Sequence, residues 1–199
     1  MTTSPDVALS ETKRALLRRR LSGDPAAVEI PRRPEGVPPP LSYAQERLWF
    51  MEQYSPGTGA YALPLALRLH GDLDVARLTR ALRQVVSRHE TLRTSFPATE
   101  DGAPYVQIAD PLPVELEQLD LDAGDVPLDQ RERRAAELVS ESAARPFDLA
   151  AGPLLRAGLC RLGAGDHVLL LTAHHAVSDG WSTGILVDEL LACYDSADP

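Results

Sequence analysis

Two long apolar segments near the carboxyl end of this sequence constrain its fold more than any other feature. Residues 154–162 and 167–175 are separated by the turn-forming sequence Gly163-Ala164-Gly165-Asp166, so we expect an antiparallel hairpin. In residues 167–175 apolar side chains occupy both faces of the expected strand. A strand of that kind must be covered on both faces, which predicts that the hairpin lies at the centre of a sheet.

A helix is predicted at residues 43–54, because Ser42 and Gln45 have the spacing of a capping box. Its apolar residues, among them Trp49, Phe50 and Met51, predict a helix that faces the core on most sides.

The remaining elements follow from hydrophobic periodicity and capping residues. Residues 75–88, with Asp74 as cap, form the clearest amphipathic pattern. We also expect helices at 128–144 and, capped by Ser182, at 183–194. Further strands are expected at 63–69, where Pro64 indicates a sheet edge or the start of a strand, at 114–119, and in a hairpin of residues 91–96 and 105–108.

Composition is typical of an ordinary cytosolic enzyme. The chain has 199 residues, 44% hydrophobic, enough for one large domain or one lobe of a larger one. Its net charge of -9 argues against nucleic acid as a partner. The amino terminus lacks a secretory signal and the apolar runs are too short to cross a bilayer, so we expect a cytoplasmic location. Cys160 and Cys193 are expected to be buried free thiols.

Residues 1–40 differ from the rest of the sequence. They carry seven basic and five acidic residues, against 13 basic and 24 acidic residues in the remainder. We interpret them as an amino-terminal arm with a proline-rich linker over residues 30–39. Residues 10–21 fit a short helix, either solvated or used for docking between domains. The folded part is expected from residue 41 to 199.

The greatest concentration of reactive side chains is at residues 173–182. Neighbouring strand residues point to opposite faces, so His174 and His175 cannot share a role. His175, at the end of a buried strand, is suited to be a general base, and His174 to be a packed, hydrogen-bonded histidine. Asp179 is able to orient the histidine or to lock the loop through a buried arginine, and we favour the lock.

Other interpretations of this segment are weaker. At most one histidine and Asp179 converge, with no third ligand nearby, so a metal site is disfavoured. Ser178 lacks the Gly-x-Ser-x-Gly context of a serine nucleophile. An inert domain with two core histidines remains open from this segment alone.

Three ordered segments resemble signature motifs of the condensation domains of nonribosomal peptide synthetases. They are Ser42-Tyr43-Ala44-Gln45-Glu46-Arg47-Leu48-Trp49-Phe50, Arg88-His89-Glu90-Thr91-Leu92-Arg93-Thr94-Ser95-Phe96 and His174-His175-Ala176-Val177-Ser178-Asp179-Gly180. The third alone is shared with chloramphenicol-acetyltransferase-like relatives. The resemblance covers roughly residues 36–199. It implies an α/β (α+β) sandwich of that kind, with a mixed, mostly antiparallel sheet flanked by helices.

The resemblance also implies a reaction, amide formation between an acyl or peptidyl thioester and the amine of an aminoacyl thioester. His175 matches the catalytic histidine and His174 the structural one. Asp179 is expected to form a salt bridge, with Arg88 as the favoured partner and Arg93 as the alternative. The Gly180 backbone and the following helix are expected to polarise the oxyanion, and Ser178 and Trp181 to support the site.

No metal or bound cofactor is implied, because the substrates arrive on the phosphopantetheine of donor and acceptor carrier proteins. The resemblance further implies two lobes, of which this chain supplies the amino-terminal one, and an adjacent adenylation domain. We therefore expect the 199 residues alone to be incomplete for catalysis. An epimerisation or O-acyltransferase domain and a non-catalytic carrier-docking module are the alternatives.

Overall fold

A computed structural model describes residues 32–34, 36–110 and 115–196, and its helices and strands belong to a compact unit, Pro38–Pro199. The segment 10–21, a predicted helix, lies outside the described residues. The helices are α2 (Tyr43–Tyr54), α3 (Val75–Arg88), the 3-10 helix η1 (Glu90–Arg93), α4 (Leu128–Ala144) and α5 (Gly180–Ser196). The strands are β1 (Ala62–His70), β2 (Thr94–Ser95), β3 (Gln107–Ile108), β4 (Leu116–Asp120), β5 (Leu155–Gly163) and β6 (Asp166–His174).

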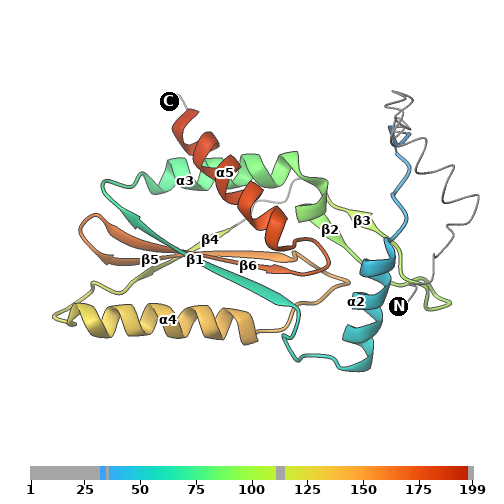
Figure 1. Cartoon of the computed structure of the whole chain (residues 1–199), viewed down its shortest axis with the longest axis horizontal. Helices are drawn as coiled ribbons and strands as arrows, with labels where there is room; N and C mark the ends of the chain where they lie inside the picture. Colours follow the sequence, from blue (N-terminus) through green and yellow to red (C-terminus); the bar gives the residue numbers. More distant parts are fainter. Residues whose placement is uncertain (1–31, 35, 111–114, 197–199) are drawn as a thin grey trace, which may run out of the picture. The chain divides into compact units, whose positions relative to one another are not determined.

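A four-stranded sheet in the order β1-β6-β5-β4 organises the fold (Figure 1). Strands β5 and β6 form the predicted antiparallel hairpin and occupy the two central positions. Strand β1, which contains Pro64, pairs antiparallel with β6 at one edge of the sheet, and an edge position is one of the two that Pro64 indicated. Strand β4 pairs parallel with β5 at the other edge. The sheet is therefore mixed and mostly antiparallel, as predicted.

Helices cover both faces of this sheet, as the two-sided apolar pattern of β6 requires. Helices α3 and α5 lie together on one face and α4 lies on the other (Figure 1). On the α3 side, Leu169 and Leu171 of β6 belong to the main core. On the α4 side, the hydroxyls of Thr172 and Ser142 lie 2.8 Å apart and share a hydrogen bond.

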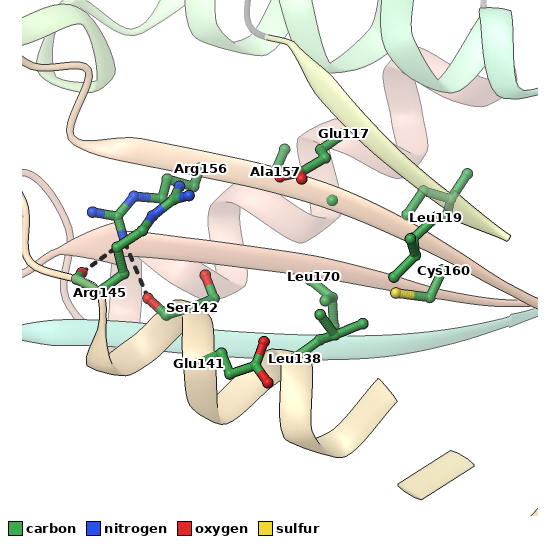
Figure 2. Close-up of a pocket in the computed structure, with 12 residues that line it drawn as sticks. Glu117, Leu119, Leu138, Glu141, Ser142, Arg145, Arg156, Ala157, Cys160 and Leu170 are labelled. Atoms are coloured by element: carbon green, nitrogen blue, oxygen red, sulfur yellow. Dashed lines mark hydrogen bonds between the residues drawn. The ribbon is translucent and has the colours of Figure 1, made fainter. Parts of the chain in front are cut away.

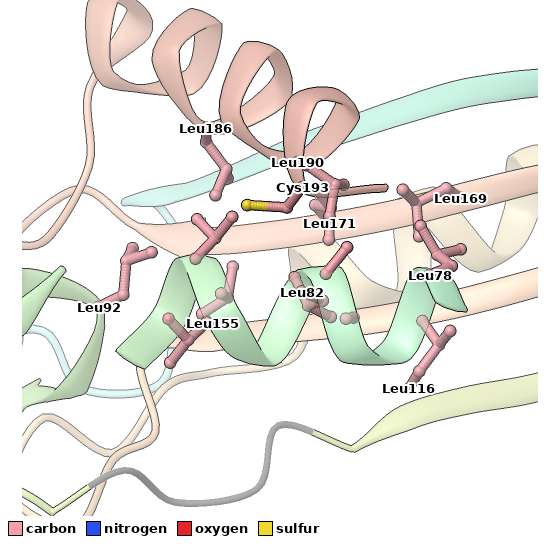
Figure 3. Packing of buried hydrophobic residues seen from close by; sticks show 14 of the residues in the cluster. Leu78, Leu82, Leu92, Leu116, Leu155, Leu169, Leu171, Leu186, Leu190 and Cys193 are labelled. Carbon is pink, nitrogen blue, oxygen red and sulfur yellow. The ribbon is translucent and has the colours of Figure 1, made fainter. Parts of the chain in front are cut away.

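The main core lies between the sheet, α3 and α5 (Figure 3). Helix α3 is capped by Asp74, whose carboxylate accepts the Arg77 N–H at 2.8 Å, and its apolar residues recur at helical spacing. Leu82 of α3 is 1% exposed, and Leu190 and Cys193 of α5 pack in the same cluster. The cysteines, Cys160 and Cys193, are buried free thiols, as expected, and burial raises the pKa of the Cys160 thiol.

A second, smaller core lies under the segment that follows β6. Its buried members come from α2, the β2–β3 region, the segment before β5 and the start of the loop after His175. They are Leu48, Phe96, Val106, Phe147, Leu149, Leu154, Ala176 and Val177.

Helix α2 has the predicted bounds, and both hydrogen bonds of its capping box are present. The prediction that it faces the core on most sides is wrong. Only Leu48 is buried, while Tyr43 is 92% exposed, Phe50 60% and Tyr54 76%. An apolar pattern on most sides does not say which side has a neighbour, and α2 lies against the end of the sheet and not across a face (Figure 1).

Two other predicted elements also differ from the structure. Residues 90–93 form the 3-10 helix η1, so that the predicted strand is reduced to the two residues of β2, which pair with β3. Helix α5 begins at Gly180 because Asp179, and not Ser182, caps it. The Asp179 carboxylate accepts the Ser182 N–H at 2.7 Å.

Candidate active site

The two adjacent histidines lie where β6 ends, and the structure separates them as predicted. His174 is the last residue of β6 and is 2% exposed. His175 is exposed, yet its backbone N–H still donates to the Tyr61 carbonyl at 2.8 Å. The strand pairing therefore holds the His175 backbone while its side chain reaches solvent.

The His175 imidazole is oriented by the loop that follows it. Its Nδ1 lies 2.8 Å from the Ser178 carbonyl oxygen. Because a carbonyl only accepts hydrogen bonds, Nδ1 carries the proton and donates it to Ser178. The second nitrogen, Nε2, keeps its lone pair and is the one able to take up a proton.

The His174 imidazole has the opposite tautomer. Its Nδ1 accepts the Ala176 N–H at 3.1 Å, so the proton lies on Nε2, which is 3.5 Å from Glu52 Oε1. The rings of Tyr61 and Phe147 meet it edge-on, with centroids at 6.1 Å and 5.9 Å. Burial lowers the pKa of His174, and the Glu52 carboxylate opposes that shift. His174 is thus a neutral, packed histidine.

Asp179 closes the loop by capping α5. Its Oδ1 accepts from both the N–H and the hydroxyl of Ser182, at 2.7 Å and 2.6 Å. These hydrogen bonds hold the pKa of the Asp179 carboxyl below its usual range. Ser178 is buried and acts through its backbone carbonyl.

The predicted salt bridge of Asp179 is wrong for both proposed partners. Arg88 Nη1 pairs with Glu189 of α5 at 3.3 Å, and the same carboxylate oxygen lies 2.7 Å from His89 Nε2. Arg93 donates to the backbone carbonyls of Val86 and Ser87, both at 3.2 Å, and of Ala109. These arginines therefore join α3 to α5 and to the segment after β3.

The first turn of α5 lies next to the histidines in sequence. Gly180 is its first residue, and the Trp181 side chain is 82% exposed. A helix amino terminus directs backbone N–H groups outward and favours negative charge, which suits a developing oxyanion.

Residues at a distance in sequence complete the site, and the sequence alone assigned them no role there. The Gln45 side chain donates to the Ala176 carbonyl at 3.2 Å, and Glu52 faces His174. Tyr61 and Phe147 frame the His174 ring. Gln45 lies within the first signature motif. The motif was therefore a signal that the Gln45 side chain makes a contact in addition to its capping hydrogen bond.

A pocket of about 240 Å³ lies elsewhere, between α4, β4 and β5, and its lining does not include the histidines (Figure 2). Arg156 borders it and donates to the carbonyls of Ser142 at 3.1 Å, Arg145 at 2.8 Å and Pro146. The guanidinium also stacks 3.7 Å from the centre of the Phe147 ring. Burial lowers the pKa of Arg156 to about 10. Arg156 thus packs against Phe147, whose ring in turn contacts His174.

The described residues contain neither a candidate metal site nor a candidate membrane-spanning helix. No three or more His, Cys, Asp or Glu side chains there gather in a way that could hold a metal ion. No helix in the same part of the chain is long and apolar enough to cross a membrane.

Comparison with known proteins identifies the family. The family model for the condensation domain matches residues 38–198, and this chain belongs to the condensation domain family. The resemblance seen in the three motifs is thereby confirmed, as is the fold class that it implied.

Individual relatives include large synthetases. One of the subunits of the linear gramicidin synthase of Brevibacillus parabrevis is 41% identical over 95% of this chain, which corresponds to 2% of its own length. Phosphinothricin tripeptide synthetase PhsC of Streptomyces viridochromogenes is 44% identical over 96% of this chain and 18% of its length. The chain thus spans a small part of these relatives.

Among solved structures, the first condensation domain of the CDA synthetase superposes with a TM-score of 0.71 and 31% identity. The match covers 80% of this chain and 40% of that structure. The fold described above therefore corresponds to about two fifths of that chain.

Proposed function

We propose that this chain is the first lobe of a domain that forms amide bonds in nonribosomal peptide synthesis. The observation that carries the proposal is the state of His175, an exposed imidazole whose Nδ1–H is bound to the Ser178 carbonyl. An oriented imidazole with an available Nε2 is what a general base requires. Membership of the condensation domain family supports the reaction class.

In the proposed reaction, the amine of an acceptor aminoacyl thioester attacks the thioester carbonyl of an acyl or peptidyl donor. The new C–N bond forms, the C–S bond breaks, and the donor's phosphopantetheine thiol is released. His175 Nε2 positions the amine or takes its proton, which the leaving sulfur then receives. The Gly180 backbone at the start of α5 stabilises the oxyanion. Both substrates are carried by partner proteins, and the chain itself holds no cofactor in this scheme.

We further propose that this chain needs a second lobe for turnover, since the 80% of it that superposes on a solved condensation domain accounts for only 40% of that structure. Residues 1–40 act in this proposal as an arm and linker before the lobe. The adenylation domain that loads the acceptor carrier is expected as a neighbour.

The test joins this chain to the second lobe of a related condensation domain and supplies loaded donor and acceptor carriers. Without a general base, His175→Ala is expected to lower the rate of amide formation at least a hundredfold, with carrier binding retained. Arg133→Ala, a change at an exposed residue of α4, controls for surface effects. Unchanged turnover in His175→Ala would contradict the catalytic role and favour a docking module.

A further inference from the structure

The residue that directly follows His175, Ala176, is held through both of its backbone polar groups. The Ala176 N–H donates to His174 Nδ1 at 3.1 Å, and the Ala176 carbonyl accepts from Gln45 Nε2 at 3.2 Å. Ala176 is 6% exposed, so neither group has water as an easy substitute. The backbone that aims His175 is therefore fixed by two side chains.

Both contacts lead to helix α2. Gln45 lies in its first turn, and its side-chain oxygen also accepts the Ser42 N–H at 2.9 Å, which leaves the amide group directed at Ala176. Glu52 lies about two helical turns further on, on the same side of α2. Its carboxylate, with 11% of the side chain exposed, is 3.5 Å from His174 Nε2.

Glu52 acts on the loop through the tautomer of His174. An anion beside Nε2 favours the proton on that nitrogen. The proton on Nε2 leaves Nδ1 as the acceptor that the Ala176 N–H needs. Without Glu52, the proton is free to occupy Nδ1, and the buried Ala176 N–H then faces a donor.

The packing of α2 agrees with such a role. Leu48 is its only buried residue and Trp49 packs against the smaller core, while the aromatic side chains Tyr43, Phe50 and Tyr54 are exposed, so its apolar attachment is confined to one side. Directional contacts also tie it to the rest of the unit, and they include the Trp49 Nε1–H, which donates to the Phe96 carbonyl at 3.1 Å. Directional contacts fix position more narrowly than apolar area does.

We propose that α2 is a two-point clamp on the backbone of Ala176, with Gln45 and Glu52 as positioning residues for His175. Gln45 acts on the carbonyl directly, and Glu52 acts on the N–H through His174. The proposal rests on the proposed function, because the aim of His175 matters for turnover only if His175 takes part in the reaction.

The first arm of the test uses the chain as it is, labelled with ¹⁵N, and reads the imidazole nitrogen shifts of His174. Glu52→Leu is expected to replace the single Nε2–H tautomer by a mixture, while Glu52→Gln, which keeps an acceptor oxygen, retains it. Glu46→Leu, at an exposed carboxylate on the same helix, is the matched control and is expected to change nothing. A thermal melt followed by circular dichroism checks that each variant is folded. Unchanged His174 signals in Glu52→Leu would overturn the clamp.

The second arm measures turnover in the two-lobed protein. Misplacing a reacting group by about 1 Å costs on the order of a hundredfold in rate, so Glu52→Leu and Gln45→Leu are expected to lower kcat about ten- to hundredfold with little change in KM. Full turnover in both variants, with His175→Ala inactive, would also overturn the clamp. Full turnover in His175→Ala would instead contradict the proposed function, and the ¹⁵N arm would still decide whether the clamp exists.

Discussion

The two hydrophobic cores of this unit are built in different ways. The main core, between the sheet and helices α3 and α5, is a large cluster of buried aliphatic side chains from regular elements. The smaller core, under the segment after β6, combines aromatic and aliphatic residues from loops and from helix α2 with polar contacts such as Gln45 to Ala176 and His174 to Glu52. The first holds the layers together, and the second holds one loop in one conformation.

Because of this difference, the main core determines the stability of the unit and the smaller core determines the positions of His174 and His175. Apolar contacts are not directional and their contribution grows with the area buried. A hydrogen bond contributes less net free energy but is costly when one partner is left buried and unpaired. We therefore expect damage to the main core to unfold the unit, and damage to the smaller core to disturb His174 and His175 before it unfolds anything.

A matched pair of leucine substitutions is expected to give the largest effect and to test the comparison. Leu82 in the main core is 1% exposed, and Leu82→Ala is expected to lower the free energy of unfolding by about 4–5 kcal/mol. Leu48 in the smaller core is 5% exposed, and Leu48→Ala is expected to lower it by about 2–3 kcal/mol. Both values lie within the usual range for cavities left by such substitutions. Loops around Leu48 can relax into the space more easily than helix and sheet layers. Urea denaturation measures both.

The same pair is expected to behave in the reverse order in the imidazole ¹⁵N spectrum, where Leu48→Ala shifts the His174 signals and Leu82→Ala does not. Equal losses of stability together with equal spectral changes would mean that the two cores are not functionally distinct.

An intermediate effect is expected from Arg156→Ala. This variant removes the donor to the Ser142, Arg145 and Pro146 carbonyls at the end of α4 and the stacking on Phe147. Hydrogen bonds from a charged donor support an expected loss of about 2–3 kcal/mol. Arg161→Ala is the control on the same strand, because Arg161 pairs with Asp120 at the exposed edge of the sheet, and a clearly smaller loss is expected there. Similar losses in both variants would rule out a special role for the carbonyl contacts.

The smallest effect expected is a dependence of stability on pH that arises at His174. Burial lowers the folded-state pKa of His174 below its usual value near 6.5. The unfolded state then binds the proton more readily, so this contribution to stability is complete above about pH 6.5 and is lost as the pH falls below it. Urea denaturation at a series of pH values between about 8 and 5 measures the slope. His174→Asn is expected to flatten it, whereas an unchanged slope in that variant would assign the effect to other groups.

Much of the fold was predictable because local signals and tertiary packing agree. The caps at Ser42 and Asp74, the spacing in α3 and the two-sided apolar pattern of β6 each correspond to an observed feature. The hairpin at 91–108 was only partly predicted, because Arg93 binds the carbonyls of Val86, Ser87 and Ala109, and no periodicity reports such contacts.

The site was predictable in outline only. Alternation along a strand separated His174 from His175, and the motif indicated which one is exposed. The partners of Asp179, Arg88 and Arg93 were not predictable, because they depend on how α5 packs on α3 and on which side chain caps α5. Glu52 and Gln45 lie more than a hundred residues from the histidines in sequence, and only the folded chain brings them together.

The two adjacent histidines have opposite tautomers, and we propose that they therefore have different roles. Long-range ¹⁵N–¹H correlation spectra of the imidazoles, recorded above about pH 7.5, where a histidine of ordinary pKa is neutral, test this assignment directly. We predict the proton of His175 on Nδ1, bound to the Ser178 carbonyl, and that of His174 on Nε2, facing Glu52. The same tautomer at both residues, or rapid averaging at His175, would contradict the account.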